Sequence, residues 1–194
     1  MLWGYQTGLG YTIAVHTTEH STKVIEQSEL QGGISLVEML FRSNIIGLVG
    51  GGSKPAFPPN QFVLWDDLQK KSIGNIDFKT NIKAVRLRRD YIAIVLQTET
   101  HVHSFNTLEK VDIIETSSNT NGIISMCSSR NICVIALPEK TTGSVLVKFY
   151  SEATPRTSII KAHKKPISAI SLNDEGTLIA TASTKVNILQ RAQK

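Results

Sequence analysis

Short runs of apolar residues recur along the chain, and each follows a half-apolar strand and a polar turn. Four of these runs are apolar at nearly every position, which is typical of strands buried on both faces: Ile45–Val49, Ile92–Leu96, Ile132–Ala136 and Leu178–Ala182. Their starts at 45, 92, 132 and 178 are roughly 40–50 residues apart. A repeat of that length with about four strands is typical of one blade of a β-propeller.

No stretch has the period of a useful amphipathic helix, so the sequence predicts an all-β, WD40-like propeller in a single partial domain. The repeat divides the chain into approximate blades at 1–31, 34–78, 81–115, 122–160 and an incomplete 162–194. Closed propellers usually contain about 4–8 blades. Four to five blades, the last of them incomplete, are expected to leave apolar surface and a strand edge open. A truncated chain, an unusual closure or a covering partner would each account for such an array.

The stretch Leu36–Asp67 contains the most distinctive local chemistry. Gly50–Gly52 ends a buried strand, because glycine accepts the backbone angles of a sharp exit. Three prolines then keep the chain out of the sheet, and Phe62–Trp65 forms the next strand. We interpret Trp65 as a residue of the blade core.

The loop after Gly50–Gly52 is either a partner-binding loop or a plain connection within the blade. Loops on a rigid scaffold commonly carry partner contacts, and prolines reduce the entropy lost on docking. The candidate partner-binding residues are Lys54, Pro55, Pro58, Pro59, Asp66 and Asp67.

Composition narrows the function classes only moderately. The 194 residues are 41% hydrophobic, which suits a folded domain, and no apolar run reaches the length of roughly 20 residues that a membrane span needs. The N-terminus has no charged region or clear cleavage site, so no signal peptide is expected. A net charge of +5 permits contact with an anionic membrane or nucleic acid without requiring it.

Cys127 and Cys133 flank a predicted turn, and we expect them to be reduced core residues.

Catalytic chemistry has little support in the sequence. There is no nucleophile motif, P-loop or dinucleotide fingerprint, so we expect no enzyme activity and no cofactor. His101 and His103 alternate on a predicted strand and face one side, but two histidines without a third ligand are a weak metal signal. Nucleic-acid binding is not expected either, because the basic residues are not interleaved with aromatic ones.

Two basic clusters remain open to more than one interpretation. His163 lies among three lysines, so it either contacts a phosphate or ties a blade together as a structural residue. Arg86, Arg88 and Arg89 end a strand just before Asp90. They either pair with Asp90 or Glu115, or they meet an acidic partner.

Three segments resemble one family when they are taken together and in order. The segments are VEMLFRSNIIGLVGGGSKPAFPPNQFVLWDD, IKAVRLRRDYIAIVL and KAHKKPISAISLNDEGTLIATASTK. They closely resemble the PROPPINs, seven-bladed phosphoinositide-binding propellers that include the WIPI proteins of autophagy. The glycine- and proline-rich loop is most similar to the WIPI-three and WIPI-four branch.

This resemblance implies a function that composition and spacing do not. It implies binding of phosphatidylinositol 3-phosphate and the 3,5-bisphosphate, and recruitment of an autophagy lipid-transfer protein through blades two and three. The implied location is cytoplasmic and peripheral, on preautophagosomal, endosomal or vacuolar membranes. The residues carried over to a partial lipid pocket are His163, Ser183 and Lys185.

The chain also departs from the family pattern. After Lys185 it reads Val186–Gln190, where the family continues with a strand similar to Gly-Thr-Leu-Ile-Arg. It contains no Phe-Arg-Arg-Gly motif, and nothing in it corresponds to blades six and seven. We therefore expect a propeller truncated in blade five, with lipid binding weakened or lost. The alternative function is a scaffold that binds a protein partner only.

Overall fold

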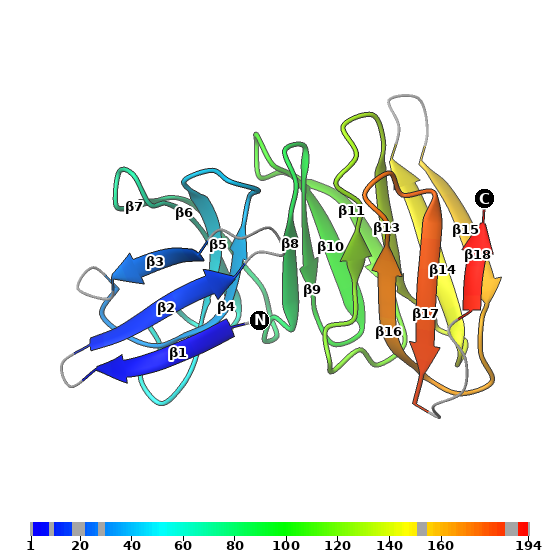
Figure 1. Ribbon diagram of the computed structural model, residues 1–194, viewed down its shortest axis with the longest axis horizontal. Helices are drawn as coiled ribbons and strands as arrows, with labels where there is room; N and C mark the ends of the chain where they lie inside the picture. The colour runs from blue at the N-terminus through cyan, green and yellow to red at the C-terminus, as the bar shows by residue number, and fades with distance from the viewer. Residues whose placement is uncertain are drawn as a thin grey trace.

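The computed structural model describes residues 30–150 and 155–184 in full, together with the backbones of strands at 2–7, 10–16, 22–26 and 190–193. All regular elements within these residues are β-strands, which form five antiparallel sheets in chain order (Figure 1). The row of sheets does not close into a ring. The structure thus confirms the predicted all-β, incomplete propeller.

Consecutive strands pair within each sheet, and we number the sheets one to five along the chain. Sheet one comprises β1 (Leu2–Thr7), β2 (Gly10–His16) and β3 (Thr22–Glu26). Sheet two comprises β4 (Ile34–Met39), β5 (Ile45–Gly50), β6 (Gln61–Asp66) and β7 (Lys71–Asp77). Sheet three comprises β8 (Ala84–Leu87), β9 (Tyr91–Val95), β10 (Glu99–Ser104) and β11 (Lys110–Glu115).

The last two sheets follow the same plan. Sheet four comprises β12 (Ser125–Met126), β13 (Cys133–Pro138), β14 (Ser144–Tyr150) and β15 (Arg156–Lys161). Sheet five comprises β16 (Ile167–Leu172), β17 (Leu178–Ser183) and β18 (Gln190–Gln193).

The second strands of sheets three and four are apolar at nearly every position because both of their faces meet a neighbouring sheet. In β9, Ile92 and Ile94 pack into the cluster shared with sheet two. Ala93 and Val95, which point the other way, pack into the cluster shared with sheet four. The period-2 alternation of side chains therefore distributes one apolar run between two cores.

The two cysteines follow the same rule. Both are buried and free. Cys133 belongs to the core between sheets three and four, whereas Cys127 belongs to the core between sheets four and five. Because they lie on opposite faces of sheet four, they form no disulfide, as predicted.

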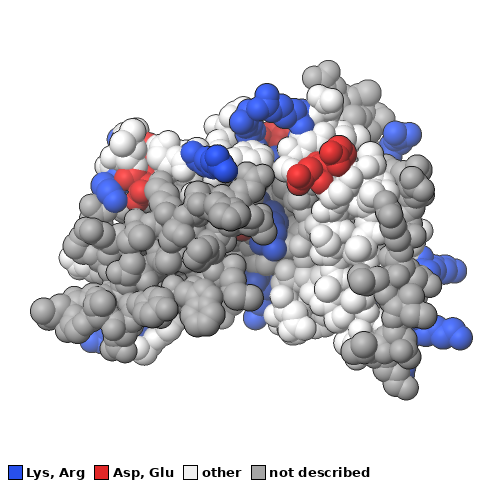
Figure 2. Space-filling model, in the orientation of Figure 1, with Lys and Arg blue, Asp and Glu red and all other residues white. Residues whose placement is uncertain are grey.

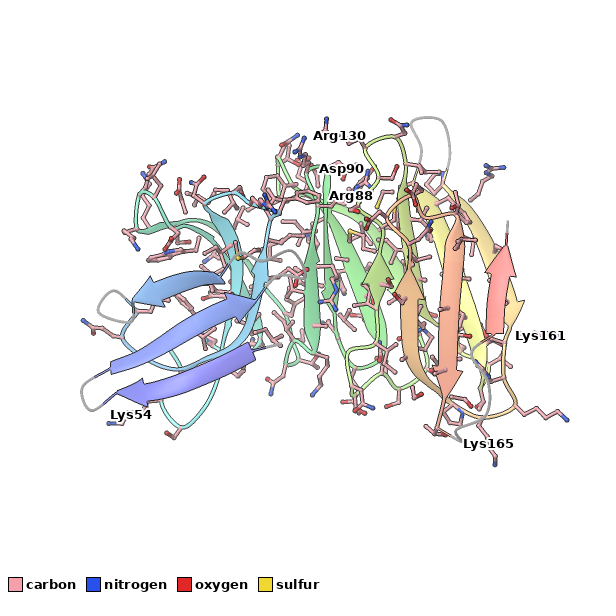
Figure 3. All side chains as sticks on the ribbon, viewed as in Figure 1. Lys54, Arg88, Asp90, Arg130, Lys161 and Lys165 are labelled. Atoms are coloured by element: carbon pink, nitrogen blue, oxygen red, sulfur yellow. The ribbon has the colours of Figure 1, made fainter. Side chains whose placement is uncertain are left out.

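Alternation of strand direction gives the array two ends. The turns at 40–44, 67–70, 88–90, 105–109, 127–132 and 173–177 lie at one end, which we call the turn end. The connections at 51–60, 78–83, 96–98, 116–124, 139–143 and 162–166 lie at the other, which we call the loop end. In Figure 3, Arg88 and Arg130 mark the turn end, and Lys54 and Lys165 mark the loop end.

Polar contacts join neighbouring sheets in addition to the apolar cores. Tyr150 donates a hydrogen bond of 2.7 Å to the Asp112 carboxylate, so the outer strand of sheet three is tied to sheet four. Lys148 also forms an ion pair with Asp112. Together with burial, the bond to Asp112 raises the pKa of Tyr150 far above its ordinary value. This hydroxyl therefore stays protonated and keeps donating.

Candidate functional site

A cleft of about 1000 Å³ opens at the turn end. Sheets two, three, four and five each contribute the turn between their first and second strands. Figure 2 shows basic side chains, with acidic ones beside them, along the edge of the molecule where this end lies. The charged residues of the lining are Arg42, Arg88, Arg89, Asp90, Arg130 and Asp174. Residues far apart in the sequence thus meet because they hold equivalent positions in successive repeats.

Arg88 forms the floor of this cleft and is structural. Its side chain is only 5% exposed. Nε and Nη2 donate to the two carboxylate oxygens of Asp90 at 2.6 and 3.1 Å. Nη1 donates to the carbonyl oxygens of Ile132 at 2.8 Å and Cys127 at 3.3 Å. One guanidinium therefore joins the β8–β9 turn of sheet three to the β12–β13 turn of sheet four.

The lining of the cleft has a net positive charge, because it contains four arginines and two aspartates. Asp90 is paired with Arg88, and the Asp174 carboxylate accepts a hydrogen bond of 2.9 Å from Ser128. Arg42, Arg89 and Arg130 are exposed guanidiniums on the lining. Such planar, weakly hydrated cations bind carboxylates or phosphates through two parallel hydrogen bonds. The cleft is therefore suited to an anionic ligand.

Phe41 adds an apolar contact to the cleft. Phe41 as a whole is 40% exposed, and the Arg89 guanidinium lies 5.4 Å from the centre of its ring, in cation–π geometry. The backbone at Phe41 has a φ of 50°, and Lys70 and Leu108 have φ values of 54° and 58°. All three of these strained positions lie in turns of the turn end, on sheets two and three. Backbone strain of this kind concentrates at functional sites.

The predicted partner loop lies at the opposite end. Lys54, Pro55, Pro58 and Pro59 are all exposed. Backbone hydrogen bonds hold the loop against Gly33, whose N–H donates to the Lys54 carbonyl at 2.7 Å. Ala56 and Phe57 pack against the apolar core of sheet two. The backbone of this loop is therefore held in place, while the side chains of Lys54 and the three prolines remain exposed.

The two predicted aspartates are separated from that loop by the length of β6, roughly 17 Å for six residues. Asp66 is only 5% exposed, and its carboxylate accepts hydrogen bonds from Asn44, Gln69 and the Leu68 N–H. These bonds, the one from Asn44 first, hold the pKa of Asp66 below its ordinary value. Asp66 therefore builds the β6–β7 turn, while Asp67 is half-buried and pairs with Lys70 at 3.1 Å.

Two of the predicted lipid residues, His163 and Ser183, lie at the loop end of sheet five. His163 is half-buried, and its Nε2 is hydrogen-bonded to Thr181 Oγ1 at 2.9 Å. The contact ties the 162–166 connection to β17, as the structural interpretation of this histidine requires. Ser183 is half-buried at the end of β17, and Lys185 lies outside the described residues.

Arg42 and Arg130 were not among the residues singled out from the sequence. A signal for them exists, because an arginine follows the first strand of three successive repeats, at positions 42, 89 and 130.

Within the described residues, no cluster of three ligands suits a metal ion. The same part of the chain contains no helix able to span a membrane.

Solved propellers share this fold. Hsv2 of Kluyveromyces lactis superposes with a TM-score of 0.74 at 20% identity, over 99% of this chain and 57% of Hsv2. A complex of Atg21 with the coiled coil of Atg16 contains a chain with a TM-score of 0.68 at 19% identity, over 95% of this chain and 59% of that one.

Sequence comparison gives the family. Autophagy-related protein 18e of Arabidopsis thaliana is 31% identical over 96% of this chain and 50% of its own length. SVP1-like protein 2 of Pichia angusta is 35% identical over 82% of this chain and 45% of its own length. The chain thus spans about half the length of these curated relatives. Because the PROPPIN family model also matches residues 4–192, the chain belongs to the PROPPIN family.

Proposed function

We propose that this chain is a non-enzymatic adaptor of autophagy that docks an acidic protein segment in the turn-end cleft. The observation that carries the proposal is the set of exposed guanidiniums, Arg42, Arg89 and Arg130, on one cleft beside the exposed ring of Phe41. Arginine and aromatic residues are enriched among the residues that dominate binding energy at protein interfaces. A basic partner would be repelled by these arginines, and an apolar one would leave them without an anionic group to bind.

The rigidity of the cleft supports docking as its role. Arg88 fixes the two turns that carry Arg89 and Arg130, so binding would order few additional groups. The strained turns at Phe41 and Leu108 border the same surface. Among related propellers, Atg21 forms a complex with the coiled coil of Atg16. That coiled coil is therefore a suitable probe for this chain.

Charge reversal tests the proposal. The double variant Arg89→Glu/Arg130→Glu is expected to weaken binding of the Atg16 coiled coil at least tenfold, because two attractive contacts become repulsive. Fluorescence anisotropy at low and moderate salt measures the change. A matched variant, Lys54→Glu/Lys165→Glu, makes the same change in net charge at the loop end and should retain binding. An equal loss in both variants, or no binding by the unmodified chain, would overturn the proposal.

A second candidate function is binding of 3-phosphorylated phosphoinositides at the loop end of sheet five. Lys164 and Lys165 are exposed beside His163, so cationic groups for a phosphate are available there. The proposed lipid contacts remain His163, Ser183 and Lys185. Flotation with vesicles containing phosphatidylinositol 3-phosphate should enrich the chain, and His163→Ala should abolish that enrichment. No enrichment over plain phosphatidylcholine vesicles would end this second proposal.

The glycine- and proline-rich loop is retained as a proposed contact for an autophagy lipid-transfer protein. Lys54, Pro55, Pro58 and Pro59 present a preorganised exposed surface, and docking there would lose little chain entropy. Asp66 and Asp67, which are also proposed partner contacts, lie at the other end of sheet two, away from this loop.

A further inference from the structure

His103 lies on β10 at the seam between sheets two and three. Its ring is 6% exposed, and Nδ1 donates to the Leu108 carbonyl at 2.8 Å. Nε2 is buried and has no hydrogen-bond partner among the described residues. The ring stacks on His101 at 6.2 Å between centroids and meets Phe78 of sheet two edge-on at 6.2 Å. Only the neutral imidazole suits this site, because a protonated Nε2 would bury an N–H without an acceptor.

The bond from His103 helps to hold a strained turn in place. Leu108 has a φ of 58°, and its N–H donates to the Ser104 carbonyl at 2.9 Å. Its side chain packs against Gly74 of sheet two, where an added Cβ would lie 2.3 Å from Leu108 Cδ1. The same 105–109 turn carries Asn106, which lines the turn-end cleft. Loss of the hydrogen bond between His103 and Leu108 would therefore act on the cleft through the 105–109 turn, which carries both Leu108 and Asn106.

We propose that His103 is an acid-sensitive latch: its protonation releases the 105–109 turn from sheet two and loosens the cleft, so that docking weakens at acidic pH. The inference rests on the proposed docking function of that cleft. It adds regulation by proton concentration, which the docking proposal does not contain.

The surroundings of His103 oppose its positive charge. On β10, His101 is the neighbouring titratable group and is bonded to Glu99 at 2.8 Å. On β11, His103 pairs with Lys110, and on β9 it pairs with the apolar Ile92. From the side of sheet two, the ring of His103 meets the uncharged Phe78, and Leu108 meets Gly74, so no charged group from that sheet is in contact with it among the described residues.

The direction of the pH effect follows from these groups. Burial lowers the pKa of His103, the Leu108 carbonyl opposes that effect, and His101 and Lys110 lower the pKa further. The opened state, with an ordinary pKa of about 6.5, takes up the proton first as the pH falls. The closed turn is therefore fully favoured above about pH 6.5 and loses stability below it.

Hydrogen exchange at the Leu108 amide tests the latch without any partner. Between pH 6.5 and 5.5, the protection factor should fall by at most about fivefold, because an opened state with a pKa of about 6.5 is already half protonated at the start of that range. His103→Asn keeps a donor for the Leu108 carbonyl but cannot titrate, so its protection should not change with pH. The matched variant His101→Asn removes the neighbouring imidazole but keeps His103, so its protection should still fall with pH. If His103→Asn fails to fold, NMR titration of the His103 ring in the unmodified chain decides the question instead.

Binding of the Atg16 coiled coil over the same pH range tests the coupling. Affinity should fall in parallel with protection in the unmodified chain and in His101→Asn, and stay constant in His103→Asn. Protection that is independent of pH would overturn the latch, and falling protection with constant affinity would overturn the coupling. Absence of binding at neutral pH would instead contradict the docking function, while the exchange measurement would still decide the latch.

Discussion

Replacing Arg88 with methionine is expected to lower the free energy of unfolding by about 2–4 kcal/mol. Methionine fills a similar volume but donates no hydrogen bond. The carbonyls of Cys127 and Ile132 would lose their bonds to the guanidinium, and Asp90 would lose its paired cation. The variant should therefore loosen the contact between sheets three and four more than a surface substitution would.

Denaturant unfolding measures this effect, and Arg89→Met is the matched control. Arg89 is the next residue and is exposed, and its described contact is the ring of Phe41. Loss of that contact should cost only about 0.5–1 kcal/mol. Equal destabilisation by the two substitutions would show that Arg88 does not join the two sheets.

Gly143→Ala is expected to destabilise the chain by about 3–4 kcal/mol. Gly143 has a φ of 77°, and a Cβ there would lie 1.9 Å from the carbonyl oxygen of His163. The substitution would thus combine backbone strain with a backbone clash between sheets four and five. It should also break the hydrogen bond from the His163 N–H to the Gly143 carbonyl, which measures 2.9 Å.

Gly52→Ala separates the two components of that effect. Gly52 has a similar φ of 83°, but an added Cβ would have no atom within 4 Å. In the same thermal or denaturant unfolding experiment, this control should lower the free energy of unfolding by about 1–2 kcal/mol, the contribution of backbone strain alone. If Gly143→Ala costs no more than Gly52→Ala, the close approach at His163 does not contribute to stability.

The strand pattern could be predicted from the sequence because burial on both faces leaves a clear signal. The run predicted at Ile45–Val49 is observed as Ile45–Gly50, and that predicted at Ile92–Leu96 is observed as Tyr91–Val95. Trp65, predicted to be a core residue, is 7% exposed. The pattern of buried runs does not predict the first strand, Leu2–Thr7, because a glycine and polar residues interrupt its apolar positions.

The cleft could not be predicted in the same way. Its arginines come from turns of different repeats, and turns carry no apolar pattern that fixes where their side chains lie. Asp66 stays a proposed partner contact, and the sequence did not indicate that its carboxylate also builds the β6–β7 turn. Adjacent positions also differ sharply, since Arg88 is buried and Arg89 is exposed. Only the register of the β8–β9 turn separates these two roles.

Hydrogen-exchange footprinting of the chain with the Atg16 coiled coil tests the central claim most directly, because it locates the docking surface without any substitution. Docking in the cleft predicts new protection in the turns at 40–44, 88–90 and 127–132, with the loop at 51–60 unchanged. Protection confined to the 51–60 loop, or no change anywhere at saturating coiled coil, would contradict the cleft as the docking site.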